Sequence, residues 1–179
     1  MSKLGKKPIL IPKEANVKLE SGKLILSGPK GSKEFSINDK IFSELISENN
    51  NLTLKLVKKN ESSKVMWGTT RSIINSALIG VTSGHEKVLE LSGVGFRATL
   101  KGDVLSLQLG FSHDISYKIP EGVKLTIEKS TIIKISGIDK KLVGTVAAEI
   151  KKLKPVEPYK GKGIKERGQV VLRKEGKKK

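Results

Sequence analysis

Apolar and polar residues alternate along several short stretches in the first half of the chain, a pattern typical of half-buried strands. Residues 17–20 and 23–27 alternate on either side of residues 21–22, a Ser-Gly pair suited to a hairpin turn. Residues 52–57 alternate in the same way and predict another strand. The intervening residues 39–46 are compatible with a short helix.

After residue 60 the apolar positions recur at helical spacing. Ser62 or Ser63 can cap this helix, which is expected to end near Gly80 or Gly84. Trp67 lies on its apolar side, and this position favours packing in a core over stacking against a nucleic-acid base.

The second half of the chain shows the same order, alternating stretches followed by a helix. Asp139 is placed to cap that helix, and Pro155 is placed to stop it after Leu153. The predicted strands cover residues 87–91, 96–100, 104–109, 115–119, 123–127 and 131–135.

Four landmarks recur in both halves in the same order and at nearly one offset, which indicates an internal duplication. Gly22 corresponds to Gly102 at an offset of 80 residues, and Gly28 corresponds to Gly110 at an offset of 82. Residues 52–56 correspond to residues 132–135 at an offset of 80, and Gly68-Thr69 corresponds to Gly144-Thr145 at an offset of 76. We therefore predict an α+β fold of two tandem duplicated small domains, each an antiparallel β-sheet packed against a helix, with an extended basic C-terminal tail. The predicted boundaries are 1–82, 83–153 and 154–179. A doubly wound parallel sheet is not expected, because the helices do not alternate with single strands.

Positive charge is concentrated in the first domain and the tail. The 179 residues carry a formal net charge of +17, with a sequence pI near 10.0. Lys and Arg outnumber Asp and Glu by 14 to 7 in residues 1–82, by 11 to 8 in residues 83–153 and by 10 to 3 in residues 154–179. Clustered cations favour a polyanionic partner, because binding to phosphates releases condensed counterions.

The chain contains no cysteine, which excludes disulfides and thiolate chemistry and suits a reducing compartment. No stretch approaches the ~18 apolar residues of a membrane span. The apolar run at residues 9–11 is shorter than the roughly 7–15 residues of a signal-peptide core. We therefore expect a soluble intracellular protein without a membrane partner.

Two glycine-rich motifs have a nucleotide-binding interpretation that the neighbouring residues do not support. Residues 93–98 read GVGFRA and match the G-x-G-x-x-A dinucleotide spacing, but the following residues continue as a strand where that motif needs a helix. Residues 28–31 read GPKG and resemble a GXXG RNA-clamping loop, but they lie between strands, which favours a β-turn.

Support for catalysis is similarly weak. His85 and His113 lie in turn regions without a nucleophile or metal-ligand partner at a suitable spacing, and the acidic residues form no convincing acid–base pair. We expect no catalytic residue, metal, cofactor or small-molecule substrate. The rival functions are an enzyme that binds a dinucleotide at residues 93–95 and a peripheral membrane protein. The latter needs a basic amphipathic helix, and the tail has few large apolar residues.

The tail, residues 154–179, combines cations with regular punctuation. Pro155 and Pro158 are expected to stiffen it so that it projects from the last helix rather than folding back. Gly161 and Gly163 would let the backbone approach a groove closely, and Tyr159 can stack on a base. The alternative is a solvated, disordered lysine tail. Earlier in the chain, Phe96 suits either a core or a stacking role, and Arg97 beside it suits a phosphate.

Residues 157–164, EPYKGKGI, resemble the signature of the bacterial-type sixth protein family of the large ribosomal subunit. Matching stretches extend over the whole chain. They are GKKPI at 5–9, GPKG at 28–31, GTTRS at 68–72, GVGFRA at 93–98, GFSH at 110–113, GIDK at 137–140 and VG at 143–144. The chain departs from the family pattern at Lys165-Glu166, where Arg-Tyr is common, and at Asp114, where proline is usual.

The resemblance implies two copies of one α+β fold and a structural role in the large ribosomal subunit that supports translation. It implies binding to large-subunit ribosomal RNA near the sarcin–ricin loop and the base of the factor-binding stalk. Neighbouring ribosomal proteins at the stalk base and, transiently, translation factors are then expected nearby. The expected location is a ribosome, either bacterial and cytoplasmic or organellar.

The RNA contacts implied by the resemblance are the tail and the turn at residues 93–98. At position 166 a carboxylate is expected to face the phosphates unless Arg167 compensates. Deleting residues 155–179 is expected to weaken RNA binding and to leave both domains folded. The predicted RNA-binding residues are Phe96, Arg97, Lys154, Tyr159, Lys160, Gly161, Lys162, Gly163, Lys165, Arg167, Arg173, Lys174, Lys177 and Lys178.

Overall fold

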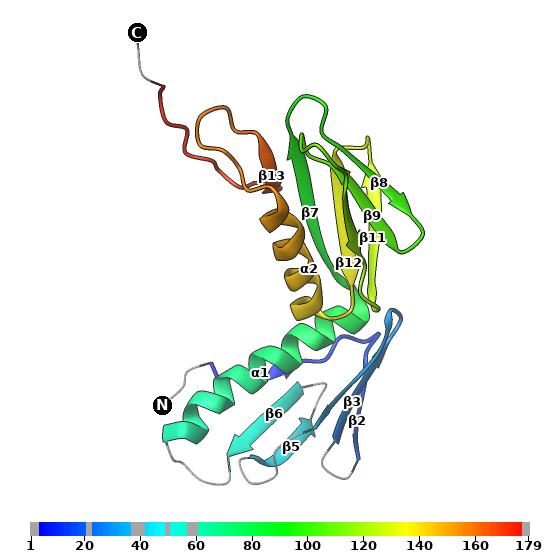
Figure 1. The fold of residues 1–179 in the computed structure, drawn as a ribbon. Coiled ribbons are helices and arrows are strands. Elements are labelled where there is room, and N and C mark those ends of the chain that lie inside the picture. The colour runs from blue at the N-terminus through cyan, green and yellow to red at the C-terminus, as the bar shows by residue number, and fades with distance from the viewer. Residues whose placement is uncertain (1–3, 21–22, 37–41, 49–50, 57–60, 177–179) are drawn as a thin grey trace. The chain divides into compact units, whose positions relative to one another are not determined.

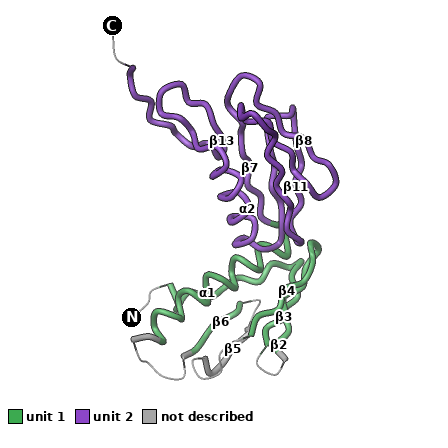
Figure 2. The backbone as a smooth tube through the Cα atoms, in the orientation of Figure 1, with its two compact units in different colours: residues 1–84 green, residues 85–179 purple. Residues whose placement is uncertain are grey.

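The computed structural model describes residues 4–20, 23–36, 42–48, 51–56 and 61–176 (Figure 1). The chain divides into two compact units, residues 1–84 and 85–179 (Figure 2). The elements of the first unit are β1 (Ile9–Leu10), β2 (Asn16–Glu20), β3 (Lys23–Gly28), β4 (Gly31–Ser36), β5 (Phe42–Glu48), β6 (Asn51–Leu56) and α1 (Glu61–Thr82). Those of the second unit are β7 (His85–Ser92), β8 (Arg97–Lys101), β9 (Val104–Gln108), β10 (Ile115–Lys118), β11 (Val123–Glu128), β12 (Ile132–Gly137), α2 (Lys140–Leu153) and β13 (Gly163–Glu166).

Six strands and a helix follow one another in each unit with the same pairing. In the first unit β2, β3 and β4 form one antiparallel sheet, and β1, β6 and β5 form another. In the second unit β8, β9 and β10 correspond to the first of these sheets, and β7, β12 and β11 correspond to the second. This repetition confirms the predicted α+β class and the duplication. The second unit has one strand more, because β13 pairs with the free edge of β7.

Gly102 and Asp139 perform the roles predicted for them, whereas the prediction that Ser62 or Ser63 caps the first helix is wrong, because α1 already begins at Glu61. Lys101 pairs with Val104, so Gly102 begins a two-residue hairpin turn, and its φ of 58° lies in the left-handed region that glycine tolerates. Asp139 caps α2, since its side chain accepts a hydrogen bond of 3.0 Å from the backbone N–H of Lys141.

The two glycine-rich motifs are turns between strands, as predicted. Gly28 pairs with Gly31 around a Pro-Lys turn. The backbone N–H of Phe96 donates to the carbonyl of Gly93 at 3.3 Å, and the chain then enters β8 rather than a helix. The dinucleotide interpretation is therefore excluded at this position, because no helix N-terminus follows to receive a pyrophosphate.

The short helix predicted at residues 39–46 is wrong for residues 42–46, which belong to strand β5, and residues 39–41 lie outside the described part of the chain. Strand β5 forms its hydrogen bonds with β6, the next strand along the chain, and this pairing outweighs the local pattern that suggested a helix. In the described part of the chain, no helix combines the length and apolar character needed to cross a membrane.

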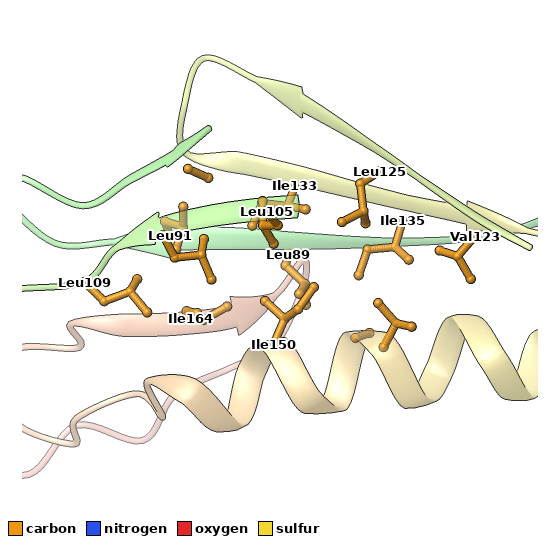
Figure 3. Packing of buried hydrophobic residues seen from close by; sticks show 14 of the residues in the cluster. Leu89, Leu91, Leu105, Leu109, Val123, Leu125, Ile133, Ile135, Ile150 and Ile164 are labelled. Atoms are coloured by element: carbon orange, nitrogen blue, oxygen red, sulfur yellow. The ribbon is translucent and has the colours of Figure 1, made fainter. Parts of the chain in front are cut away.

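Each helix buries one apolar face. In α1 the buried residues include Ile74, Leu78 and Val81. In α2 they include Val146 and Ile150, which belong to the core of the second unit. Figure 3 shows Ile150 on the side of the helix that faces the sheet. That core also receives a side chain from the C-terminal segment, since strand β13 passes beside β7.

The C-terminal segment folds back onto the second unit instead of projecting from it. Ile164 is 0% exposed and lies in the core with Leu89, Leu91 and Ile150 (Figure 3). Its backbone N–H donates to the carbonyl of Lys154 at 2.9 Å. The prediction that this segment projects is therefore wrong for β13, because Ile164 is buried in the core and the strand pairs with the free edge of β7.

Candidate nucleic-acid interface

Four connections lie together at one end of the second unit, which we call the loop end. Gly163 pairs with Ser92, so the connection that leads into β13 meets the sheet beside the turn that follows β7. Figure 1 shows both of these loops extending from the same end of the sheet. The loop end comprises residues 93–97, 109–114, 129–131 and 154–163.

The other two connections reach the loop end through strand pairing and backbone hydrogen bonds. Arg97 pairs with Gln108, which places the loop after β9 beside the start of β8. Leu91 N–H donates to the carbonyl of Thr131 at 2.8 Å, which places the turn between β11 and β12 beside the end of β7. The scaffold thus gathers residues that are far apart in sequence.

Residues 157–162 form a closed loop rather than an extended tail. The backbone N–H of Glu157 donates to the carbonyl of Lys162 at 2.8 Å, and that of Gly161 donates to the carbonyl of Glu157 at 3.0 Å. Tyr159 is 54% exposed, and Lys160 is exposed beside it. The loop therefore displays one aromatic ring and two lysines to solvent.

Gly161 in this loop and Gly163 just after it pack against the protein itself. A Cβ added at Gly163 would lie 2.6 Å from the carbonyl oxygen of Pro155 and 2.6 Å from the Cα of Val156. A Cβ added at Gly161 would lie 3.2 Å from the guanidinium of Arg173. Both glycines are buried, so the prediction that they let the backbone enter an RNA groove is corrected. They allow the close approach that folds the loop.

Several predicted RNA-binding cations are exposed to solvent. They are Arg97, Lys160, Lys162, Arg167, Arg173 and Lys174. Arg173 and Lys174 return to the 157–162 loop, since the backbone N–H of Lys174 donates to the carbonyl of Pro158 at 2.9 Å. Lys177 and Lys178 were also predicted as contacts and lie outside the described residues.

Three predicted residues have partners within the protein. Phe96 is only 7% exposed and packs in the core, so the idea that its ring stacks on a base is corrected. Lys165 forms an ion pair of 3.1 Å with Glu90. The ammonium of Lys154 lies 4.2 Å from the ring centroid of Phe111, a cation–π geometry.

Glu166 also points to its own unit rather than to a phosphate. Its two carboxylate oxygens lie 2.7 Å from Lys87 Nζ and 2.8 Å from Lys151 Nζ. Hydrogen bonds from Lys151 and then Lys87 lower the pKa of Glu166 to about 2. The glutamate that departs from the family pattern at this position is therefore paired within the protein, and the expectation that its carboxylate faces phosphates is corrected.

Three exposed residues at the loop end, Phe111, His113 and Lys129, were not among the predicted RNA contacts, and Val94 was covered only by the contact expected at residues 93–98. Phe111 is 45% exposed, and its ring lies 6.5 Å from that of His113 at an interplanar angle of 26°. Val94 is 94% exposed at the tip of its turn, and Lys129 has a φ of 53° in the turn after β11. The GFSH stretch was a usable signal, because two aromatic residues in an exposed loop can contact bases.

The charges of the loop end suit a polyanion. Among the described residues of these connections and of the adjoining residues 173–175, seven Lys and Arg accompany three Asp and Glu. The cations are Arg97, Lys129, Lys154, Lys160, Lys162, Arg173 and Lys174, and the acids are Asp114, Glu157 and Glu175. Within the described ranges, no three His, Asp or Glu side chains gather into a possible metal site. The cations of the loop end are suited to binding phosphates.

A duplicated α+β scaffold that gathers cations and exposed rings at one end is typical of structural proteins suited to a polyanionic partner. The comparisons identify the family. The model of the family described as ribosomal protein L6 matches residues 92–167. The chain is 45% identical to large ribosomal subunit protein uL6 of Phenylobacterium zucineum over 179 residues, which is 100% of both chains. It is 46% identical to uL6 of a Nitratiruptor species over 177 residues, 99% of this chain and 98% of that protein.

The chain therefore belongs to the ribosomal protein L6 family. The resemblance seen in the sequence is confirmed, and with it the predicted place in a ribosome. The chain is a structural, non-enzymatic protein of the large ribosomal subunit.

Proposed function

We propose that this protein binds large-subunit ribosomal RNA through the loop end of its second unit, near the sarcin–ricin loop and the base of the factor-binding stalk. One observation carries the proposal. The EPYKGKGI signature is folded so that its glycines face the protein, while Tyr159, Lys160 and Lys162 face solvent. A loop that packs its small residues inward and its cations outward is preorganised to bind a phosphate surface.

The binding mechanism is electrostatic and geometric. Lysines and arginines at the loop end would neutralise phosphates of RNA segments that repel each other, and each neutralised phosphate adds about 0.7–0.9 to the slope of log K against log salt. Exposed rings such as Tyr159 and Phe111 would add contacts to bases. The scaffold would hold RNA segments in register beside stalk-base proteins, in the region where translation factors dock.

Hydroxyl-radical footprinting of large-subunit ribosomal RNA tests the location. The variants are wild type, a Lys160→Ala/Lys162→Ala double mutant and a control double mutant, Lys124→Ala/Lys140→Ala. The control removes the same charge from exposed lysines at the opposite end of the second unit. Protection at the sarcin–ricin loop and stalk base that only the first mutant loses supports the proposal. Protection elsewhere, or equal loss in both mutants, overturns it.

A further inference from the structure

We infer that Glu166 is a positioning residue that orients the second run of cations, Arg173 and Lys174, beside the 157–162 loop. The inference rests on the proposed function, because it concerns how the RNA-binding surface is held together. It assigns to a carboxylate a favourable role in binding a polyanion.

The first step is the clamp that Glu166 forms. Its carboxylate contacts Lys87 of β7 at 2.7 Å and Lys151 of α2 at 2.8 Å. One side chain at the end of β13 is thus tied to the neighbouring strand and to the helix. Charge-assisted hydrogen bonds of this length are stronger than neutral ones, and they fix the direction in which the chain leaves the sheet.

The second step is the turn that begins at the clamp. The backbone N–H of Glu166 donates to Oε1 of Gln169 at 3.3 Å, and the N–H of Gln169 donates to the carbonyl of Glu166 at 3.0 Å. The N–H of Arg167 is also held, by the carbonyl of Val88 at 2.9 Å. The chain therefore reverses at a point anchored by residue 166.

The third step is the return of the chain to the loop end. After the turn, the side chain of Arg173 lies against Gly161, and Lys174 N–H donates to the carbonyl of Pro158. Residues 167–172 are mostly exposed, so few packing contacts guide this return. The ion pairs of Glu166 and the hydrogen bond from Arg167 N–H to Val88 anchor the start of this return.

The inference makes a prediction opposite to that of net charge alone. A Glu166→Gln substitution raises the formal net charge from +17 to +18 and releases two lysines from their partner. Simple electrostatics therefore predicts tighter RNA binding. If Glu166 positions Arg173 and Lys174, the substitution instead weakens binding and lowers the salt slope, because fewer phosphates are contacted.

The test measures binding of the full chain to large-subunit ribosomal RNA at several salt concentrations. We expect Glu166→Gln to lower affinity by about tenfold and to lower the salt slope by about 1–2 units, the loss of one or two phosphate contacts. The matched control is Glu175→Gln, which removes an equal charge beside Lys174 from an exposed position. It should bind as tightly as wild type or more tightly. A Glu166→Gln chain that behaves like Glu175→Gln overturns the inference.

A charge-swapped variant, Lys87→Gln with Lys151→Glu and Glu166→Lys, keeps the test decisive if Glu166→Gln folds poorly. It re-forms one ion pair without setting Lys87 against a second lysine, and it lowers the formal net charge by only one, so affinity and salt slope should recover toward wild type. A folded swap without recovery contradicts the inference. The Lys160→Ala/Lys162→Ala mutant separates the two claims: if it binds like wild type, the proposed interface fails, whatever Glu166 does.

Discussion

Replacing Ile164 with alanine tests whether the C-terminal segment is part of the fold. The side chain is 0% exposed within the core of the second unit. Truncating a fully buried isoleucine costs about 2–5 kcal/mol, and a value of about 3 kcal/mol is expected here, because β13 is an edge strand that can partly relax into the space. For a unit of this size, that loss lowers Tm on the order of 10–20 °C.

Native-state hydrogen exchange measures the stability of each unit separately. In the Ile164→Ala chain, the opening free energy of amides in β7 and β12 should fall by about 3 kcal/mol, while that of amides in β3 of the first unit is unchanged. Leu172→Ala is the matched control, since Leu172 lies in the same segment and is 86% exposed. Its effect should stay within about 0.5 kcal/mol. Equal, small effects of both substitutions would refute the assignment of residue 164 to the core.

Three further predictions follow from local geometry. Gly163→Ala should destabilise the second unit by about 2–4 kcal/mol in chemical denaturation, because φ is 142° and the new Cβ meets backbone atoms at 2.6 Å. Gly168 has a φ of 82°, but no atom beyond its chain neighbours lies within 4 Å of a Cβ added there, so Gly168→Ala should cost only about 1 kcal/mol. Equal losses of stability for the two substitutions would contradict this account. The pKa of Glu166 is lowered from 4.5 to about 2, so its pairing stabilises the fold above pH 4.5, and that contribution is lost as the pH falls toward 2. Acid titration of stability should therefore show a loss of about 1 kcal/mol in this window that Glu166→Gln abolishes, and an unchanged profile in that variant would count against the clamp. Burial, followed by the hydrogen bond to a glutamate, raises the pKa of Tyr117 to about 12, so in a Tyr159→Phe chain the phenolate absorbance should rise only near that pH, and a midpoint near 10 would contradict the packing.

The repeated architecture was predictable because it follows from local patterns. Alternation identified most strands, the change of period marked both helices, and Asp139 marked the start of α2. The duplication followed from landmarks at nearly one offset, and the observed strand pairing has the same repeat. The strand, helix and cap signals depend on neighbours in sequence, and the duplication depends on comparing the two halves of the chain, so no tertiary information was needed.

Strand β13 was not predictable in this way. It contains one large apolar residue, Ile164, beside a glycine, a lysine and a glutamate, and its partner strand lies far away in sequence. The prolines before it suggested an extended exit from α2, yet a free edge of β7 was available to pair. This also changes the expected result of deleting residues 155–179, which should now destabilise the second unit as well as remove cations.

The candidate site was predictable in residue type and less so in orientation. A lysine in a charged segment has the same sequence signature whether it faces solvent, as Lys160 does, or pairs with an acid, as Lys165 does with Glu90. An aromatic residue after Gly-x-Gly is equally ambiguous, and Phe96 is buried because its ring packs between glycine backbones at Gly93 and Gly110. Only the three-dimensional contacts separate these cases.

The salt dependence of RNA binding tests the central claim most directly, namely that the folded loop end of the second unit is what meets the phosphates. Affinity for large-subunit ribosomal RNA would be measured by filter binding from about 50 to 200 mM salt. The Lys160→Ala/Lys162→Ala chain is predicted to lower the slope of log K against log salt by about 1.4–1.8, while Lys124→Ala/Lys140→Ala leaves it unchanged. Equal slopes for the two double mutants would contradict the account.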